Sequence, residues 1–310
     1  MTVDIWGIGH CCQDNICVVE QYPPEDGSTH ILDIDDSQGG GAAATAMVAA
    51  SRLGAAAGVI ANLGDDPVGD RILDGFAREG VHTGLIRRIP GGRSSTSYVM
   101  VNPENGSRTK FPYRDQLPPL ELSQEIRGAL AGARILHLDG TQYENALRAA
   151  RLAKELGLTV SLDACSMQED NGKNWELASL ADILIANEKY PRRLTGRDGV
   201  EEALAEMAAR GLGPRALACT AGNRGCWYVK DGSVRHLPAF SIRAVDTTGA
   251  GDTFHGAFLA CWLTRPELEY CMRFASAAAA LKCLRRGGRA GIPDRAAAEA
   301  FLERSEEAEP

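Results

Sequence analysis

Short apolar, β-branched runs alternate along the chain with longer segments whose apolar residues recur at helical spacing. Near-continuous apolar runs are typical of strands that are covered on both faces. Strands are predicted at 2–9, 57–64, 133–140, 158–164, 181–187 and 215–222, and helices at 41–53, 67–79, 142–156, 199–210, 252–264 and 267–284. This alternation predicts an α/β fold with a doubly wound, mainly parallel sheet between two layers of helices.

Two segments depart from this alternation and resemble hairpins. Residues 16–35 alternate in polarity around a Pro/Asp/Gly turn, and residues 95–114 contain an Asn-Pro-Glu-Asn-Gly turn between two strand-like runs. We expect them to form a small β-sheet lid over the carboxyl ends of the core strands, where ligands bind in such folds. The chain is then a single domain, 1–310, with lid segments at about 12–37 and 91–115. Two surface hairpins without a function are the alternative.

The composition narrows the class of partner. The chain carries 33 Lys and Arg against 41 Asp and Glu, a net charge of −8, which disfavours generic binding to nucleic acids or anionic membranes. No apolar run reaches the ~18–20 residues of a membrane helix, and the N-terminus lacks a signal-peptide pattern. The nine cysteines include no Cys-x-x-Cys pair, which favours reduced, buried cysteines in a cytoplasmic protein.

Residues 245–258, VDTTGAGDTFHGAF, place a glycine-rich turn directly before an apolar helical pattern. Gly249 and Gly251 tolerate backbone angles that other residues resist, so the amides of the turn can point into one concavity. The N-terminal end of the following helix adds a partial positive charge. The turn therefore predicts a site for phosphate or another oxyanion. A plain helix N-cap formed by Asp252 is the alternative.

The longer string DTTGAGDTFHGAF closely resembles the signature of the pfkB family, the ribokinase-like carbohydrate kinases. A second string, GGGAAATAMVAASRLGA at 39–55, resembles the family's G-G-x-x-x-N-x-A sugar-binding loop, and the resemblance runs from residue 3 to about residue 294. It implies a ribokinase-like three-layer αβα fold. It also implies an enzyme that uses ATP and Mg²⁺ to phosphorylate a primary hydroxyl of a ketose or furanose sugar. A homodimer through the lid is common in the resembling family.

The resemblance makes Asp252 the catalytic base, with Gly249, Ala250 and Gly251 forming the anion hole around the transferred phosphoryl group. Phosphoryl transfer depends mostly on positioning and on neutralising charge at the equatorial oxygens. Backbone amides supply this without reorganisation. An ordinary Asp has a pKa of about 3.9, far below that of an alcohol. Asp252 is therefore expected to orient the attacking hydroxyl and to accept its proton late.

The sugar contacts that the resemblance implies begin with Asp14, which would bind sugar hydroxyls through both carboxylate oxygens; a turn cap is its alternative role. The glycine pair that lets the backbone approach the sugar is Gly40 and Gly41. Thr45 stands where the family has Asn, and it offers one hydroxyl in place of an amide donor and a carbonyl acceptor. The lid residues that could reach the sugar, or could simply pack or face solvent, are Thr96, Tyr98 and Arg108.

The nucleotide side is carried by two further segments. LACTAGNRGCWYV resembles the family's T-x-G-x-x-G turn beside the ATP phosphates, and residues 274–294 lie where the family packs adenine. Arg286 and Arg289 are interpreted as surface charges. The ATP-binding residues that the resemblance implies are Asn187, Thr220, Gly222, Gly225, Ala277, Ala280 and Gly288.

The metal motif departs from the family pattern. The N-x-x-E motif begins at Asn187, but Tyr190 stands at the Glu position and the nearest acid is Glu188. Because Mg²⁺ keeps several waters, we expect Asn187 and Glu188 to hold it through water, or the ATP oxygens to hold it directly. By resemblance, a monovalent cation such as K⁺ lies near Asp246 and Thr248.

Within the family the sequence is most similar to the 6-deoxy-6-sulfofructose kinases, through His255, the run GGRAGIPD and the Thr at the Asn position. A sulfonate needs a cationic or multi-donor pocket. Those kinases carry a Lys in the first lid turn, where this chain has Ser28. An uncharged ketose or pentose such as fructose, tagatose or ribose, or a nucleoside, therefore stays open. A compensating charge would come from Arg93, Arg108, Lys110 or Arg114.

Two other classes of protein compete with a kinase. A dinucleotide-binding oxidoreductase has only GIGHCC in its favour, which lacks the third glycine of G-x-G-x-x-G and precedes a hairpin. A sugar-binding regulator with little or no catalysis is disfavoured by the intact Asp252 and its glycine turn, but it is compatible with the altered motif at Asn187.

Overall fold

The short apolar runs form the strands of one large sheet. The computed structural model describes residues 2–104, 108–114, 116–166 and 168–307. The six predicted strands are β1 (Ile5–Ile8), β4 (Ala57–Gly64), β8 (Ile135–Leu138), β9 (Thr159–Asp163), β10 (Ile183–Asn187) and β11 (Ala216–Thr220). The sheet also contains β5 (His82–Ile89), β12 (Cys226–Lys230) and β13 (Ser233–Leu237). Its order is β13-β12-β11-β10-β9-β8-β1-β4-β5, and only the pairings of β12 are antiparallel.

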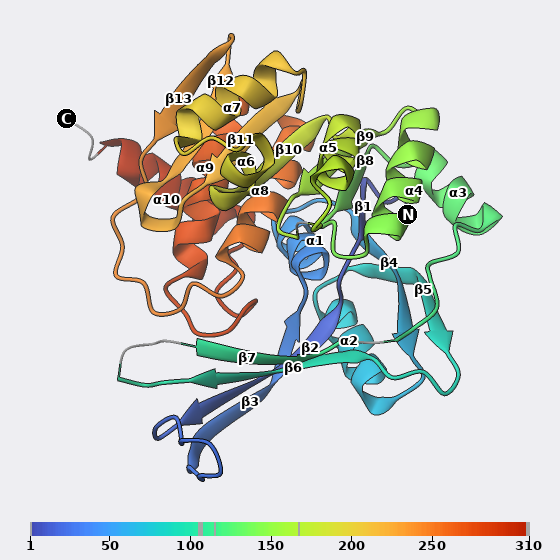
Figure 1. Ribbon diagram of the computed structural model, residues 1–310, viewed down its shortest axis with the longest axis vertical. Helices are drawn as coiled ribbons and strands as arrows, with labels where there is room; N and C mark the ends of the chain where they lie inside the picture. The colour runs from blue at the N-terminus through green and yellow to red at the C-terminus, as the bar shows by residue number, and fades with distance from the viewer. Residues whose placement is uncertain (1, 105–107, 115, 167, 308–310) are drawn as a thin grey trace.

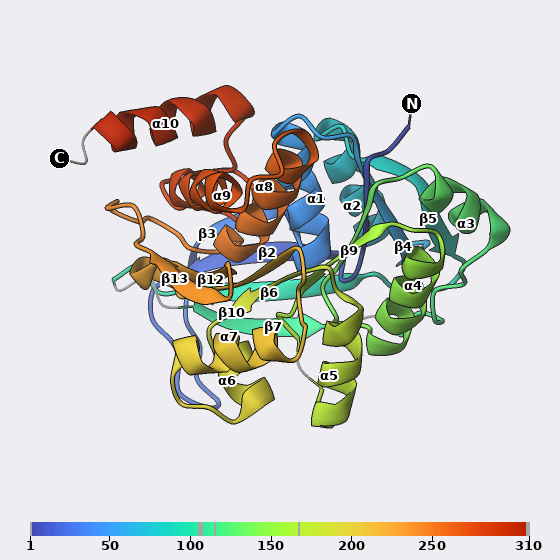
Figure 2. The ribbon, with the colours of Figure 1, turned by 90° about the horizontal axis from the view of Figure 1, so that it is seen from above.

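Helices cover both faces of this sheet, as Figure 2 shows, which confirms the predicted three-layer arrangement. One layer contains α1 (Ala42–Arg52), α2 (Pro67–Arg78), α8 (Ala250–Thr264), α9 (Leu268–Lys282) and α10 (Arg295–Glu307). The other contains α3 (Gln124–Ala131), α4 (Tyr143–Glu155), α5 (Asn171–Leu180), α6 (Lys189–Thr195) and α7 (Val200–Ala209). A short 3-10 helix, η1 (Gly222–Arg224), follows β11.

The two layers explain why the strands are apolar at nearly every position. In β10, Ile183 and Ile185 pack into the hydrophobic core on the α8 side, whereas Leu184 packs into the core on the α4 side. Successive side chains of a strand point to opposite faces. A strand between two helical layers therefore needs apolar residues at odd and even positions alike, and this is the pattern from which the sheet was predicted.

The two predicted hairpin segments form a second, four-stranded sheet, called the lid sheet below. It contains β2 (Cys12–Val19), β3 (Ile31–Gly40), β6 (Ser95–Val101) and β7 (Arg108–Tyr113), in the order β3-β2-β6-β7. β2 and β6 are parallel, and the other two pairs are antiparallel. Figure 1 shows the lid sheet extending below the three-layer core, to which β1 and α1 connect it.

One buried carboxylate holds both ends of the first lid segment. Asp139 follows β8 and is fully buried. Its Oδ2 accepts hydrogen bonds from the backbone N–H groups of His10 (2.8 Å) and Ala43 (3.1 Å). Its Oδ1 accepts from the N–H and the hydroxyl of Thr141. The chain leaves the core at His10 and re-enters it at Ala43, so both crossing points meet at the same side chain.

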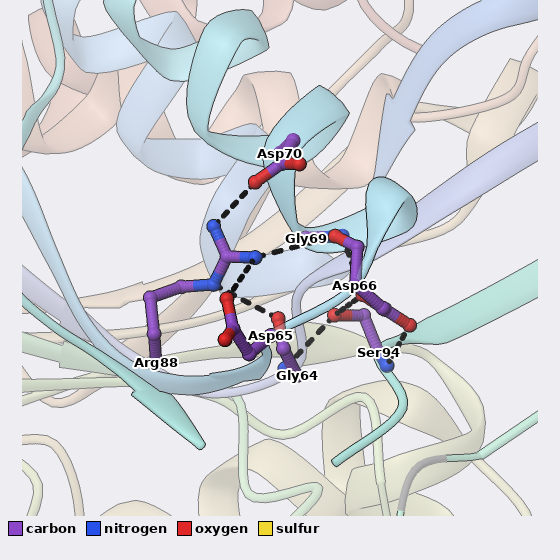
Figure 3. Close-up of polar contacts among 7 residues, drawn as sticks. All are labelled: Gly64, Asp65, Asp66, Gly69, Asp70, Arg88 and Ser94. Carbon is purple, nitrogen blue, oxygen red and sulfur yellow. Dashed lines mark hydrogen bonds and ion pairs between the residues drawn. The ribbon is translucent and has the colours of Figure 1, made fainter. Parts of the chain in front are cut away.

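A second carboxylate fixes the entry to β6. Asp66 caps α2 by accepting from Gly69 N (2.8 Å), and it also accepts from the backbone N–H (2.9 Å) and the hydroxyl (2.8 Å) of Ser94. Arg88, at the end of β5, donates to the carbonyl of Gly64 beside this cap (2.9 Å). Burial raises the pKa of Asp66, but the donors from Ser94 and Gly69 bring it below its ordinary value. Figure 3 shows these contacts converging where the chain turns toward the lid sheet.

The structure also tests two predictions from the composition, that the cysteines are reduced and buried and that the chain has no membrane helix. None of the nine cysteines, all of which lie among the described residues, is joined in a disulfide, and eight are buried as predicted, whereas Cys165 is exposed. In the part of the chain that the structure describes, no helix combines the length and the apolarity that a membrane crossing needs.

Candidate active site

The predicted oxyanion turn lies at the N-terminus of α8. Gly249 caps the helix in the left-handed conformation (φ 74°), and a Cβ added there would lie 2.4 Å from the carbonyl oxygen of Gly288. Only glycine meets both conditions. A Cβ on Gly251 would meet nothing within 4 Å, so the first turn faces open space. The first amides of a helix have no acceptor within it. Here the N–H of Ala250 donates to the carbonyl of Thr247 (3.3 Å), and the N–H of Gly251 has no acceptor among the described residues.

Asp252 lies in this first turn and is half-buried. Burial, followed by the negative charges of Asp163 and Asp139, raises the pKa of Asp252 to about 7, against the lowering effect of His255 and Lys110. The expectation of an ordinary, low pKa was therefore wrong for this carboxylate. A base whose pKa is near the working pH is better matched to accepting a proton.

Buried polar groups surround Asp252 on the core side. His255 lies one helical turn after Asp252, and its Nε2 is 3.3 Å from Oδ1 of Asp163. The ring of His137 lies 5.5 Å from that of His255, and His137 Nδ1 is 3.1 Å from the hydroxyl of Ser161. Burial and the charge of His255 lower the pKa of His137 to about 3, so His137 is neutral at physiological pH. The ends of β8 and β9 thus set the electrostatic environment of Asp252.

The sugar-side candidates Asp14, Gly40 and Gly41 are brought together. A Cβ on Gly40 would lie 2.4 Å from Oδ2 of Asp14, so this glycine admits the carboxylate against the backbone. Gly41 has φ 96°, and a Cβ there would lie 2.0 Å from the carbonyl oxygen of His10. Burial raises the pKa of Asp14, while the Cys12 thiol, Lys110 and Arg289 act to lower it. These residues form the floor between the lid sheet and α1.

Arg289 is buried, and its interpretation as a surface charge was wrong. Its Nε donates to the Thr45 hydroxyl (3.2 Å), and its Nη2 donates to the Gly40 carbonyl (3.1 Å). Its guanidinium carbon lies 5.4 Å from the centre of the Phe76 ring. Thr45 therefore acts together with Arg289 behind the glycine pair. A single Arg among glycines carries no periodic signal, so the sequence pattern did not reveal this pair.

The lid candidates do not share one face. Thr96 donates to the carbonyl of Gln13 (3.1 Å) and accepts from Asn15 (2.9 Å). Ser97 is paired with Asp14 across the β2–β6 ladder, and neighbouring side chains alternate, so Thr96 lies on the opposite face from Asp14. Arg108 is paired with Val101 at the start of β7, and its side chain lies outside the described residues. Tyr98 shares the face of Thr96 and is exposed.

Only some of the residues predicted to bind ATP lie close to one another. Asn187 and Thr220 are neighbours at the carboxyl ends of β10 and β11. Gly222 is the first residue of η1 and Gly225 directly follows it, both with positive φ. Ala277 is fully buried in the hydrophobic core. Ala280 is 9% exposed in the same helix, and Gly288 packs against the turn at Gly249.

The altered metal motif has a structural explanation. Tyr190 is 3% exposed, and its hydroxyl donates to the carbonyl of Asn174 (3.4 Å), so it fills the core beside α5. Glu188 forms an ion pair with Arg224 of η1. The side-chain oxygen of Asn187 accepts from the N–H of Lys189. Among the described residues, no three His, Cys, Asp or Glu side chains gather as a metal site.

The turn before the glycines is closed by Asp246. Its Oδ1 accepts from the N–H (2.8 Å) and the hydroxyl (2.7 Å) of Thr248. Its Oδ2 accepts from Gly287 N (2.9 Å), and its backbone carbonyl accepts from Nζ of Lys282 (2.8 Å). The predicted cation residues Asp246 and Thr248 are thus bonded to each other.

Comparison with known proteins identifies the family to which the sequence and the fold are similar. The model of the pfkB family of carbohydrate kinases matches residues 4–295. The chain is similar to the ribokinase of Haemophilus influenzae, with 31% identity over 270 residues that cover 85% of this chain and 87% of the relative. It is similar to the ATP-dependent ribose-1-phosphate kinase of Halopiger xanaduensis, with 30% identity over 303 residues that cover 97% and 98%. The fold matches Arabidopsis thaliana ribokinase complexed with ribose and ATP, with a TM-score of 0.85 at 24% identity and coverage of 98% and 99%.

Proposed function

Because the chain belongs to the pfkB family of carbohydrate kinases, we propose that this phosphotransferase transfers the γ-phosphoryl group of ATP to a primary hydroxyl of a ketose or furanose sugar. One observation carries the proposal. A carboxylate whose pKa is raised to about 7, Asp252, lies in the same helical turn as the backbone amides that follow the left-handed Gly249. A proton acceptor and an oxyanion site side by side are the two parts that phosphoryl transfer to an alcohol needs.

Different residues have different roles in the proposed reaction. Asp252 orients the sugar hydroxyl and takes its proton, while the amides of Gly249, Ala250 and Gly251 stabilise the charge on the transferred group. Mg²⁺, when bound with ATP, neutralises phosphate charge. The oxygen donors at the end of β10 suit it through bridging water, because the Glu188 carboxylate is engaged by Arg224 and Asn187 is exposed. Asp14 binds sugar hydroxyls above Gly40.

We favour a sugar that carries an anionic group, with 6-deoxy-6-sulfofructose as the first candidate. Lys110 of β7 is paired with Val99, two residues after the Ser97 that is paired with Asp14, so it lies on the Asp14 face of the lid sheet. Its positive charge acts to lower the pKa of both Asp14 and Asp252. A cation there suits a sulfonate or phosphate on the sugar. A similar protein is named as a kinase of a sugar phosphate. Uncharged fructose, tagatose or ribose, and nucleosides, are the alternative substrates.

A coupled assay of ADP formation tests the function. Purified protein with ATP and Mg²⁺ is given fructose, 6-deoxy-6-sulfofructose, tagatose, ribose or adenosine. We expect ADP formation that depends on the acceptor, with the highest kcat/KM for the sulfonated ketose. If the protein binds ATP or a sugar but forms ADP with none of these acceptors, it would instead be a sugar-binding regulator. Highest activity on an uncharged sugar would overturn the choice of substrate but not the reaction.

The raised pKa of Asp252 predicts an acid limb in the rate profile. Only the ionised carboxylate accepts a proton, so kcat/KM should fall about tenfold per pH unit below about pH 7. His255→Asn should move the limb to higher pH, because His255 lowers this pKa, and Asp163→Asn should move it to lower pH. A wild-type profile that stays flat well below pH 7 would contradict the assignment of the base.

We also propose that the enzyme is a homodimer through the lid sheet and acts in the cytoplasm. Exposed apolar side chains gather on the face of the lid sheet that points away from Asp14. Tyr98 and Phe111 are cross-strand partners there, and Tyr113 and Ile34 lie at positions of the same parity. Their exposed fractions are 49%, 55%, 39% and 59%. A contiguous apolar patch of this kind typically marks an interface, and a second copy covers both patches at once.

The double variant Tyr98→Lys and Phe111→Lys is expected to be a monomer. The two lysines of each copy would bring four cations together at a self-complementary interface, where they would repel one another. The mass measured by sedimentation velocity should be twice the chain mass of 33.1 kDa for the wild type and equal to the chain mass for the double variant. Leu284→Lys, which adds a cation at another exposed apolar residue outside the lid sheet, is the matched control and should leave the mass unchanged. A wild-type protein that sediments as a monomer would refute the dimer.

A further inference from the structure

Lys282 is the last residue of α9, and its side chain is fully buried. Its ammonium donates to the backbone carbonyl of Asp246 at 2.8 Å. Burying an ammonium is unfavourable unless polar groups surround it, and lysine is almost never fully buried without a partner. The burial of this ammonium therefore suggests that it stabilises a neighbouring group.

The group that Lys282 meets is the turn that shapes the anion hole. Asp246 lies three residues before Gly249, and its two carboxylate oxygens accept from Thr248 and Gly287. Burial raises the pKa of Asp246, but the bonds from Thr248 and Gly287 and the charge of Lys282 bring it below its ordinary value. The turn thus contains an ionised carboxylate, and Lys282 provides a buried positive charge beside it.

The resemblance to the pfkB family implies a monovalent cation near Asp246 and Thr248, and the described residues do not fit one. A cation needs oxygen lone pairs turned toward it. Here the carboxylate oxygens of Asp246 accept from N–H and O–H groups, and its carbonyl oxygen accepts from an ammonium. Lysine has three donors and no acceptor. A second positive charge close to Nζ would also be repelled in an environment that excludes water.

We propose that Lys282 is a positioning residue that replaces the monovalent cation, so that this enzyme works without potassium. The proposal rests on the proposed kinase function for its activity measurements. The ammonium holds the carbonyl of Asp246 and balances its carboxylate. This keeps the turn from Asp246 to Gly249 in the conformation that presents the amides of α8 to the phosphoryl group.

The first test compares cations in wild-type protein. Activity and the melting temperature are measured in KCl, NaCl and N-methyl-D-glucamine chloride at one ionic strength, in buffers free of other monovalent metal ions. We expect the three rates to agree within about twofold and the three melting temperatures to coincide. Activation by potassium of about tenfold or more, or a potassium-specific rise in melting temperature, would overturn the proposal.

The second test removes the ammonium. Lys282→Met and Lys282→Gln should lower kcat by about tenfold or more, because an electrostatic contribution to the anion hole is lost. KCl or NH₄Cl, but not N-methyl-D-glucamine chloride, should restore part of the rate and raise the melting temperature of the variants. Lys230→Met, which removes an exposed lysine paired with Glu269, is the matched control and should respond to no cation.

The melting temperatures separate this proposal from the proposed function. They require no substrate, so they remain informative if no sugar is phosphorylated. Variants of Lys282 that keep wild-type activity and stability in all three salts would show that the ammonium has no such role. If neither variant folds in any salt, the response of the wild-type melting temperature to potassium still decides whether an ion binds.

Discussion

Asp252→Asn is expected to lower kcat by about 10²–10⁴-fold, the usual cost of losing a general base. The amide keeps the size of the side chain and its place in the first turn of α8, but it cannot accept the proton of the sugar hydroxyl. KM for the sugar should change less than kcat, because the residues proposed to bind the sugar, Asp14, Gly40 and Gly41, are untouched. Initial rates of ADP formation at saturating ATP and sugar measure the effect.

The stability of this variant provides its control. The pKa of Asp252 is raised to about 7 in the fold, above the unfolded value of about 3.9. The stabilisation that this shift represents is present below the unfolded pKa and is lost as the pH rises toward 7. The Asn variant has no carboxylate to ionise, so its melting temperature at pH 8 should equal or exceed that of wild type.

A second control uses a carboxylate that caps a different helix. Asp170 caps α5 through Gly172, and Asp170→Asn should leave the rate unchanged. An Asp252→Asn enzyme whose turnover stays within about threefold of wild type would eliminate Asp252 as the base. A loss of turnover accompanied by unfolding would instead assign Asp252 a structural role.

Asp139→Ala is expected to destabilise the protein by on the order of 3–5 kcal/mol. Asp139 is fully buried and accepts hydrogen bonds from the backbones of His10, Ala43 and Thr141. Alanine leaves these donors buried without an acceptor and opens a cavity at the junction of β1, α1 and β8. Urea denaturation followed by circular dichroism measures the free energy of unfolding.

Asp65→Ala is the matched control for this stability measurement. Asp65 forms an ion pair with Arg88, but its side chain is 61% exposed, so its loss should cost less than about 1 kcal/mol. Asp139→Asn should lie between the two, because an amide keeps one acceptor oxygen. If Asp139→Ala cost no more than Asp65→Ala, the crossing points would be held by other contacts.

The sequence predicted the layers of the fold because they depend on local patterns. Apolar runs such as 181–187 and helical spacing such as 252–264 identify their elements without knowledge of any partner. The turn at Gly249 was also predictable, since its conformation is required by the backbone itself. The resemblance then supplied candidate roles that neither periodicity nor composition contains.

Residues that act through distant partners were not predictable. Asp139 bonds to His10, 129 positions away, and Arg289 bonds to Thr45 across 244 positions. Nothing in the local sequence of either residue reports these pairings. Lys282 ends a helix, where a basic residue is ordinary, and only the packing shows that its ammonium is buried. The same holds for the pKa of Asp252, which depends on charges from β8, β9 and β7.

The way in which Asp139 holds the chain has a consequence for how sugar preference can change. The segment between His10 and Ala43 carries Asp14, Gly40 and Gly41, and its two ends meet at one carboxylate. Asp139 therefore fixes both ends of this segment, and Arg289 holds the Gly40 carbonyl within it. A segment from another kinase, or a longer tip, that keeps these contacts is expected to leave the helix that carries Asp252 in place. Sugar choice and phosphoryl transfer can then diverge independently within one chain.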